Sequence, residues 1–337
     1  MTPSTTTRPL VGIDAIRAAA ETLRGVAIRT ALVAFGPPAD RAFLKAESLQ
    51  PIGAFKIRGA YVAIAALTPE ERARGVITYS SGNHAQGVAR AARLLGAPAV
   101  VVMPDNAPPI KRERVAADGA EIVTVGPSSE ERRTVAERLA RERGLSVIPP
   151  YDDDRIIAGQ GTIGLEIVED LPDVGTILVP IGGGGLAAGV AAAVKALSPR
   201  TRVVGVEPEL AADAQQSLRD GRVVEWPAEA VSRTIADGTR TQSLGERTFA
   251  HLVALLDGIV TVTEGEIAAA VRLAAEESRL VVEPSGALSI AALRFRGHEA
   301  GIDAGPGHEA GGSVVAVVSG GNVDPERYRE LLASAVP

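Results

Sequence analysis

The chain contains no cysteine, which excludes disulfide bonds, thiolate metal sites and a cysteine nucleophile. Aromatic residues make up only 3% of it, so the core must be built from Ala, Val, Ile and Leu. Such a core suits helices packed on a parallel sheet. Lysine is scarce as well, because only four of the 35 basic residues are lysine: Lys45, Lys56, Lys111 and Lys195.

No apolar run reaches the length of a membrane span, because Gly, Pro or a charge interrupts each one. Residues 1–10 are polar and rich in threonine, so we expect no signal peptide and a cytoplasmic protein. The net charge of −6 and the pI of about 5.5 argue against binding to nucleic acid or to anionic membranes.

A length of 337 residues favours two lobes. Short Val/Ile runs alternate with helical patterns from residue 76 onward, which predicts an α/β fold with two open, mostly parallel sheets covered by helices. We expect seams near residues 51 and 147. A small domain would then span 51–147 and carry Lys56, and a large domain would comprise 1–50 and 148–337.

The predicted strands and helices follow one another closely along the chain. Strands are expected at 42–44, 76–79, 99–103, 121–125, 146–148, 176–179, 202–206, 258–261 and 313–318. Helices are expected at 13–23, 55–67, 84–95, 110–118, 129–143, 161–171, 186–197, 211–218, 267–278 and 284–295. The first helix is expected to pack on the large domain.

Lys56 lies in the stretch Gly53-Ala54-Phe55-Lys56-Ile57-Arg58-Gly59-Ala60, at the start of an apolar helical run. A lysine amine can lose its proton and attack a carbonyl carbon, which a guanidinium effectively cannot do. The positive end of a helix dipole and partial burial would both lower the pKa of this amine. The alternative is an ordinary surface lysine.

Three turns between a strand and a helix, or at the end of a strand, could bind a ligand. Ser80-Ser81-Gly82-Asn83-His84 offers hydroxyls and helix N–H groups to a carboxylate, although Ser and Asn also serve as helix caps. Gly182–Gly185 can fold its N–H groups around one anion, as a phosphate loop does. Ser319-Gly320-Gly321-Asn322 presents a hydroxyl after a buried strand, or is a simple turn.

Two further stretches are rich in carboxylates or histidine. Glu207, Glu209 and Asp213 surround a helix start, where acids either complement the dipole or bind a hard cation. The segment Gly297–Gly311 contains Gly-His-Glu-Ala-Gly twice. Its glycine content favours a flexible surface loop over a metal site.

The combination resembles the fold-type II pyridoxal-phosphate enzymes of the threonine dehydratase/serine racemase family, which share the tryptophan synthase β-like fold. The resemblance covers nearly the whole chain and rests on five motifs in the family order. They are Phe55-Lys56-Ile57-Arg58-Gly59-Ala60, Ser80-Ser81-Gly82-Asn83-His84-Ala85-Gln86-Gly87, Gly182–Gly185, Val282-Glu283-Pro284-Ser285-Gly286 and Ser319-Gly320-Gly321-Asn322.

The resemblance assigns a role to each motif. It implies that Lys56 holds pyridoxal 5'-phosphate as an internal aldimine and moves the Cα proton, with Ser81 as a base on the opposite face. The implied cofactor-binding residues are Phe55, Lys56, Asn83, Gly182, Gly183, Gly184, Gly185, Glu283, Ser319 and Gly320. The implied substrate-binding residues are Ser80, Ser81, Asn83 and His84, and the implied ligands of Mg²⁺ or another divalent cation are Glu207, Ala211 and Asp213.

The implied reaction removes the β-hydroxyl of L-threonine or L-serine and releases a 2-oxo acid and ammonia. The family also implies a homodimer. Ala54 stands where many members have Ser, and no regulatory domain is expected after Pro337.

Other functions stay open. Within the family, the alternatives are a serine or aspartate racemase and a 3-hydroxyaspartate dehydratase. A nicotinamide oxidoreductase would use the Gly182–Gly185 run, with Glu207 on the ribose, but the glycine spacing is wrong for that fold. A ligand-binding protein without catalysis is disfavoured because Lys56 and Ser81 are both present.

Overall fold

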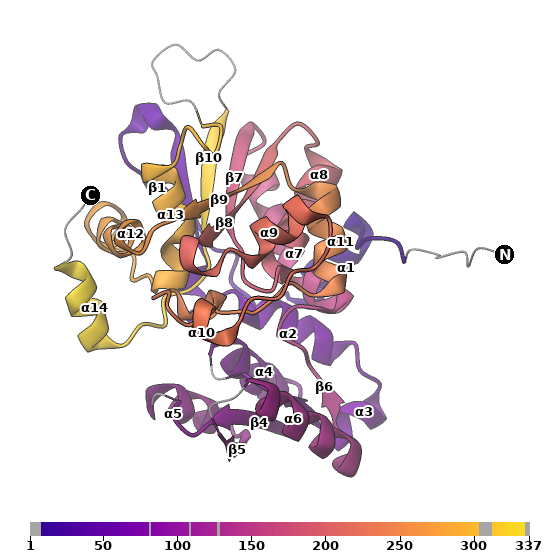
Figure 1. The fold of residues 1–337 in the computed structure, drawn as a ribbon. Coiled ribbons are helices and arrows are strands. Elements are labelled where there is room, and N and C mark those ends of the chain that lie inside the picture. The colour runs from indigo at the N-terminus through magenta and orange to yellow at the C-terminus, as the bar shows by residue number, and fades with distance from the viewer. Residues whose placement is uncertain (1–7, 81, 108, 127–128, 303–311, 334–337) are drawn as a thin grey trace.

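Two sheets organise the chain, and they lie one above the other in Figure 1. The computed structural model describes residues 8–80, 82–107, 109–126, 129–302 and 312–333, so that Ser81 and residues 303–311 lie outside the described range. The larger sheet has the strand order β1-β2-β10-β7-β8-β9, and the smaller one has the order β5-β4-β3-β6.

In the larger sheet only β1 and β2 pair in antiparallel fashion, and all other neighbours are parallel. Its strands are β1 (Leu32–Phe35), β2 (Ala42–Ala46), β7 (Val174–Pro180), β8 (Arg202–Pro208), β9 (Gly258–Val262) and β10 (Ser313–Val318). Because β10, β7 and β8 are adjacent and parallel, the turns that follow them lie along one edge of the sheet.

Helices cover both faces of this sheet. On one face lie α1 (Ile13–Thr22), α7 (Asp154–Asp170), α8 (Gly185–Leu197), α9 (Asp213–Asp220) and α11 (Glu246–Leu255). On the other lie α12 (Glu264–Ser278), α13 (Pro284–Phe295) and α14 (Pro325–Leu332). Alternate residues of β10 enter the two cores, with Val315 and Val317 in the first and Ala316 and Val318 in the second.

The smaller sheet is parallel throughout and consists of β3 (Val76–Thr78), β4 (Ala99–Pro104), β5 (Glu121–Val125) and β6 (Ser146–Val147). One face packs against α2 (Lys56–Ala65), α4 (Asn83–Leu94) and α5 (Pro109–Ala117), and the other against α6 (Ser129–Arg143). The short α3 (Pro69–Arg74) joins α2 to β3. At the junction with the larger sheet lie α2 and α4 (Figure 1).

Glycines bring the helices around the junction unusually close together. A Cβ on Gly159 of α7 would lie 2.6 Å from the Cα of Gly59 in α2. A Cβ on Gly189 of α8 would lie 2.3 Å from the carbonyl oxygen of Ile157 in α7. Because real Cβ atoms do not approach so closely, the backbones can pack this tightly only with glycine at these positions. Such packing suits a chain that has few large side chains.

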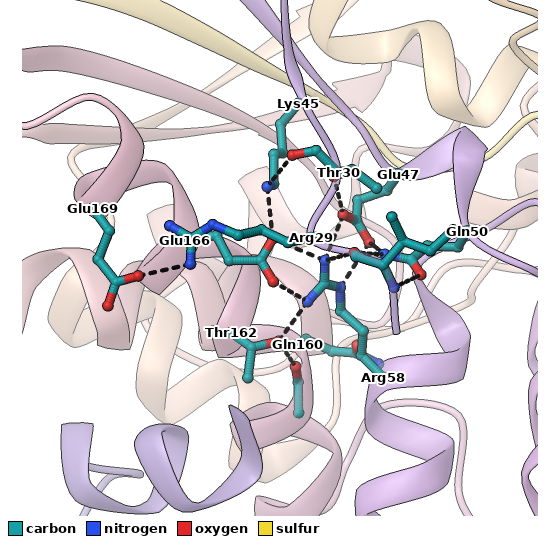
Figure 2. Close-up of polar contacts among 12 residues, drawn as sticks. Arg29, Thr30, Lys45, Glu47, Gln50, Arg58, Gln160, Thr162, Glu166 and Glu169 are labelled. Carbon is teal, nitrogen blue, oxygen red and sulfur yellow. Dashed lines mark hydrogen bonds and ion pairs between the residues drawn. The ribbon is translucent and has the colours of Figure 1, made fainter. Parts of the chain in front are cut away.

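A buried ionic network joins α2 to the larger sheet and to α7 (Figure 2). Arg58 of α2 donates to both carboxylate oxygens of Glu47, each at 2.8 Å, and to those of Glu166 at 2.7 and 3.0 Å. Lys45 of β2 donates to Glu166 at 2.6 Å and to the carbonyl oxygen of Thr30 at 2.7 Å. Two cations thus balance two carboxylates, two positions along the helix from Lys56.

The structure adds elements that the sequence did not predict: β1, α3, α11, α14 and the short α10 (Ala228–Val231). The α7 helix starts at Asp154 rather than at 161, because the Asp153 side chain accepts a hydrogen bond from the N–H of Arg155 and caps it. The domain boundaries near 51 and 147 stay a prediction. Among the described residues, no helix is long and apolar enough to span a membrane.

Candidate active site

The predicted functional turns all follow the carboxyl ends of strands. Ser80–His84 follows β3, Gly182–Gly185 follows β7, and Ser319 follows β10 directly. Two hydrogen bonds cross the junction of the two sheets: Asn83 donates to Glu283, and the N–H of Phe55 donates to the carbonyl oxygen of Ser319. The sequence-predicted residues Phe55, Lys56, Asn83, His84, Glu283, Ser319 and Gly320 are therefore brought together in one place.

Lys56 occupies the first turn of α2 and is partly buried. Its Nζ donates to the carbonyl oxygen of Pro150 at 2.7 Å and lies 5.2 Å from the centre of the Phe55 ring. Burial lowers the pKa of this amine from 10.5 to about 8. A substantial fraction of Lys56 is thus unprotonated near neutral pH, as a nucleophile or a base requires.

The N-terminus of α4 lies beside Lys56. Its N-cap is Gly82, which has no side chain, so the first-turn N–H groups of α4 are not capped by a side chain at that position. Ser80 accepts a hydrogen bond from the N–H of Gly82 at 3.3 Å. Ser81 lies outside the described residues. The arrangement favours a carboxylate-binding turn over a cluster of helix caps.

His84 is buried in the first turn of α4. Its Nε2 donates to the carbonyl oxygen of Ile148 at 3.0 Å, and its Nδ1 has no hydrogen-bond partner among the described residues. Burial, together with the charge of Lys56, lowers the pKa of His84 to about 3. The ring is therefore neutral at physiological pH, and Nδ1 can accept a hydrogen bond from a ligand.

Asn83 and Glu283 form a direct pair. The amide Nδ2 of Asn83 donates to Oε1 of Glu283 at 2.6 Å. Burial raises the pKa of Glu283 to about 8, with a smaller contribution from Asp237. Gly320 lies against both side chains, since a Cβ on it would stand 2.3 Å from Glu283 Oε1 and 3.1 Å from Asn83 Nδ2. A side chain at this position would displace the Asn83–Glu283 pair.

Ser319 is buried, and its backbone connects β10 to the start of α2. Its carbonyl oxygen accepts a hydrogen bond from the N–H of Phe55 at 3.1 Å. Its Oγ donates to the carbonyl oxygen of Ser285 at 3.3 Å, a long and weak hydrogen bond. This hydroxyl can readily exchange its partner for a ligand atom.

The Gly182–Gly185 loop forms the start of α8. Gly184 has a φ of +91°, a left-handed conformation that favours glycine, and Gly183 is held by Thr248 Oγ1, which donates to its carbonyl oxygen at 2.7 Å. Thr241 Oγ1 is buried without a partner among the described residues, 3.6 Å from where a Cβ of Gly182 would stand. A helix start without a side-chain cap at Gly184, together with a hydroxyl donor, suits this loop to binding an anion.

Tyr151 connects this loop to Lys56. It directly follows Pro150, and its ring lies so close to Gly183 that a Cβ there would stand 2.2 Å from the ring carbon Cδ1. Burial raises the pKa of Tyr151 to about 12, and the nearby Asp213 adds to this effect. Tyr151, Thr241 and Thr248 were not among the residues predicted from the sequence. The Pro149-Pro150-Tyr151 break after a strand, in a chain with four tyrosines, was a signal for the first of them.

Glu207 and Asp213 face each other near the end of β8. Glu207 caps α9, because its two oxygens accept the N–H groups of Ala214 at 2.9 Å and Gln215 at 2.8 Å. Asp213 Oδ2 is buried and lacks a partner among the described residues. Burial and mutual repulsion raise the pKa of Glu207, and burial raises that of Asp213 to about 7.

The raised pKa values show that a double negative charge is unfavourable here, so a cation that neutralised it would stabilise both carboxylates in their ionised form. The described ranges contain no group of three or more His, Cys, Asp or Glu side chains that could hold a metal ion. Any further ligands at Glu207 and Asp213 would therefore be backbone carbonyls, such as that of Ala211, or water.

Comparisons with known proteins agree with this geometry. Residues 28–320 match the family model described as pyridoxal-phosphate dependent enzyme. The chain is 42% identical to the L-threo-3-hydroxyaspartate ammonia-lyase of Saccharomyces cerevisiae over 86% of each chain. It is 41% identical to an L-threonine ammonia-lyase of Thermotoga maritima, over 94% of this chain and 76% of that one.

A solved structure is similar over nearly the whole length. The structure of maize serine racemase superposes with a TM-score of 0.88 at 39% identity and covers 96% of this chain and 97% of that one.

Proposed function

The chain belongs to the family of pyridoxal-phosphate dependent enzymes, and we propose that it is an ammonia-lyase that acts on L-threonine or L-serine. The observation that carries this proposal is the position of Lys56. Its amine has a lowered pKa and donates to the carbonyl oxygen of Pro150, next to Tyr151, whose ring lies against the glycine loop. The relatives named as ammonia-lyases support the reaction type.

The residues of the site fit the cofactor. The Gly182–Gly185 loop and the unpartnered Thr241 hydroxyl would hold its phosphate, and Ser319 would meet the ring nitrogen. Lys56 would hold it through the amine, and Asn83 would contact the ring hydroxyl. When bound, this cofactor supplies an electron-withdrawing ring that makes the Cα proton of an attached amino acid acidic.

The protein's own residues account for the remaining steps. Ser80, His84 and the N–H groups at the start of α4 bind the carboxylate of the substrate. The free Lys56 amine, whose pKa is close to the working pH, takes the proton from Cα. The β-hydroxyl then leaves as water with the proton that Lys56 has taken from Cα, and the resulting enamine hydrolyses to a 2-oxo acid and ammonia.

Three further features belong to the proposal. A divalent cation such as Mg²⁺ would bind at Glu207, Ala211 and Asp213, where Asp213 Oδ2 is unpartnered among the described residues. A homodimer and a cytoplasmic location are the family expectation. Ser81 would face Cα from the side opposite to Lys56.

The second candidate is one of two related reactions. One is ammonia release from a substrate with two carboxylates, and the other is racemisation, which changes only the configuration at Cα. The Saccharomyces cerevisiae relative is named for L-threo-3-hydroxyaspartate, and the similar maize structure is named a serine racemase. Both reactions begin with the same removal of the Cα proton, so Lys56 would have the same role in each.

The test is to supply the cofactor-loaded protein with L-threonine, L-serine and L-threo-3-hydroxyaspartate and to quantify the 2-oxo acid and the D-amino acid formed. We expect a 2-oxo acid from L-threonine or L-serine. Lys56→Ala should abolish it, while the matched variant Lys195→Ala should retain it. A 2-oxo acid formed from L-threo-3-hydroxyaspartate alone, or a D-amino acid formed without any 2-oxo acid, would favour the second candidate. Failure to bind the cofactor would contradict the proposal altogether.

A further inference from the structure

Asn322 follows β10 and is hydrogen-bonded on both sides of its amide. Its Nδ2 donates to the carbonyl oxygen of Ile52 at 2.8 Å and to Oδ1 of Asn83 at 2.8 Å. Its Oδ1 accepts a hydrogen bond from the guanidinium of Arg114 in α5. Gly53, with a φ of +72°, allows this close approach, since a Cβ on it would lie 2.5 Å from Asn322 Oδ1.

The partners of Asn322 leave its amide only one orientation. A backbone carbonyl can only accept a hydrogen bond and a guanidinium can only donate one, so Nδ2 must face Ile52 and Oδ1 must face Arg114. The atom of Asn83 that faces Asn322 Nδ2 must then be an acceptor, namely its Oδ1.

The orientation of Asn83 follows from that of Asn322. With Oδ1 committed to Asn322, the Nδ2 of Asn83 lies on the other side, where it donates one hydrogen to Glu283 at 2.6 Å. The hydrogen bonds of the described residues use only this one of its two amide hydrogens. A second N–H is thus left for a ligand.

We infer that Asn322 is a positioning residue, which fixes the amide of Asn83 so that an N–H, and not the carbonyl oxygen, is offered to the ring hydroxyl of the cofactor. This inference rests on the proposed function. An N–H donor stabilises the deprotonated, negatively charged form of that hydroxyl. A carbonyl oxygen in the same place would favour the protonated form instead, and would change the electronic state of the ring.

The side chain of Asn322 contacts neither Lys56 nor the anion loop in the hydrogen bonds of the described residues, and its link toward the proposed cofactor site is Asn83. The backbone N–H of Asn322 also contacts Glu283, but a side-chain substitution leaves that contact in place. The contacts also cross between the two sheets. Asn83 and Arg114 belong to helices of the smaller sheet, whereas Asn322 and Glu283 border strands and helices of the larger one. The amide of Asn83 is thus held in this orientation by both halves of the molecule.

Asn322→Asp is the sharpest test. The new carboxylate can still pair with Arg114, but it offers only acceptors to Asn83, so the Asn83 amide should turn over and present its oxygen to the ring. The readout is the pH titration of the visible absorbance of the cofactor-loaded protein. We expect its midpoint to rise by about one pH unit or more, and kcat to fall about ten- to a hundredfold with little change in KM, as loss of a hydrogen bond to a charged group predicts.

Two controls separate positioning from other effects. Asn106→Asp makes the same substitution at an exposed asparagine and should leave the titration unchanged. In an Asn83→Ala background, Asn322→Asp should produce no further shift, because the group through which it acts is absent. Should Asn322→Asp fail to fold, as judged by circular dichroism, Asn322→Ser retains one donor and should give an intermediate shift.

The outcomes distinguish this inference from the proposed function. Wild-type protein that acquires no cofactor absorbance contradicts both. Wild-type absorbance with an unshifted Asn322→Asp variant contradicts the inference alone. An equal shift in the presence and absence of the Asn83 amide also overturns it, since Asn322 would then act by another route.

Discussion

Arg58 donates two hydrogen bonds of 2.8 Å to the carboxylate of Glu47, and the two side chains are 1% and 0% exposed. Burial raises the pKa of a carboxyl group, but the charge of Arg58 and its hydrogen bonds outweigh this for Glu47 and lower its pKa below the usual value. The pair lies at the junction of the two sheets, two positions along α2 from Lys56. It therefore ties the start of α2, which carries Lys56, to the segment after β2.

Replacement of Arg58 by Met should destabilise the protein strongly. It leaves Glu47 buried without its cationic partner and removes two hydrogen bonds from Glu166. Breaking a buried ion pair on one side costs about 3–5 kcal/mol. Urea unfolding measures this cost. Arg138→Met breaks an exposed pair with Glu142 and should cost less than about 1 kcal/mol. Equal costs for the two variants would show that the buried network adds no stability.

The contact between α2 and α7 leads to a second prediction. A Cβ on Gly159 would stand 2.6 Å from Gly59, so Gly159→Ala should push the two helices apart and cost about 1–3 kcal/mol. Gly265→Ala is the matched control, because that glycine also lies in a helix but has only one atom at 4.0 Å. It should be neutral or stabilising by up to about 1 kcal/mol. A Gly159→Ala variant as stable as the wild type would mean that the helices relax freely.

The sequence predicted the strands that carry the site well, because parallel strands buried on both faces read as continuous Val/Ile runs. The strand at 313–318, which is buried throughout and precedes Ser319, and the helices at 129–143 and 284–295 have the predicted bounds. The predicted residues around these strands also meet, since Asn83 donates to Glu283 at the start of α13, and Ser319 accepts from Phe55, which precedes Lys56.

What the sequence could not supply depends on contacts between distant segments. Nothing local distinguishes Arg58, which is 1% exposed, from the many exposed arginines of this chain. The orientation of Asn83 is decided by Asn322, 239 positions away, and by the carbonyl of Ile52. The start of α7 was missed because Gly159 interrupts the apolar periodicity of its first two turns, although it allows the close packing of α7 against α2.

The lowered pKa of Lys56 predicts how its amine reacts with pH. Because burial brings the pKa to about 8, the neutral amine should predominate above that pH, rather than above 10.5. In cofactor-free protein, modification of Lys56 by an amine reagent should rise with pH to half its maximum near pH 8, as followed by peptide mass spectrometry. In the Lys56→Arg variant the modified peptide should be absent, which would identify Lys56 as the modified residue. A midpoint near pH 10 would show that the amine is solvated, and would weaken its assignment as a base near neutral pH.

The proposed cation site at the end of β8 gives a prediction that does not require the cofactor. Asp213 Oδ2 is buried without a partner among the described residues, and Glu207 lies beside it with both oxygens on the N–H groups of α9. A divalent cation that binds the folded state alone stabilises it in proportion to RT ln(1 + [L]/Kd), which is about 2.7 kcal/mol at a hundredfold excess over Kd. Mg²⁺ should therefore raise the Tm of the protein, and a chelator should reverse the effect.

Asp213→Asn tests whether this stabilisation arises at the proposed site. The variant removes one negative charge and with it a hard anionic ligand, so the response of Tm to Mg²⁺ should disappear. The variant without Mg²⁺ should be at least as stable as the wild type, because it also removes the repulsion that raises the pKa of Glu207. Asp220→Asn, at the other end of the same helix, should keep the full response. If Asp213→Asn kept it too, the cation would bind elsewhere, and the two carboxylates would serve only as partners of α9.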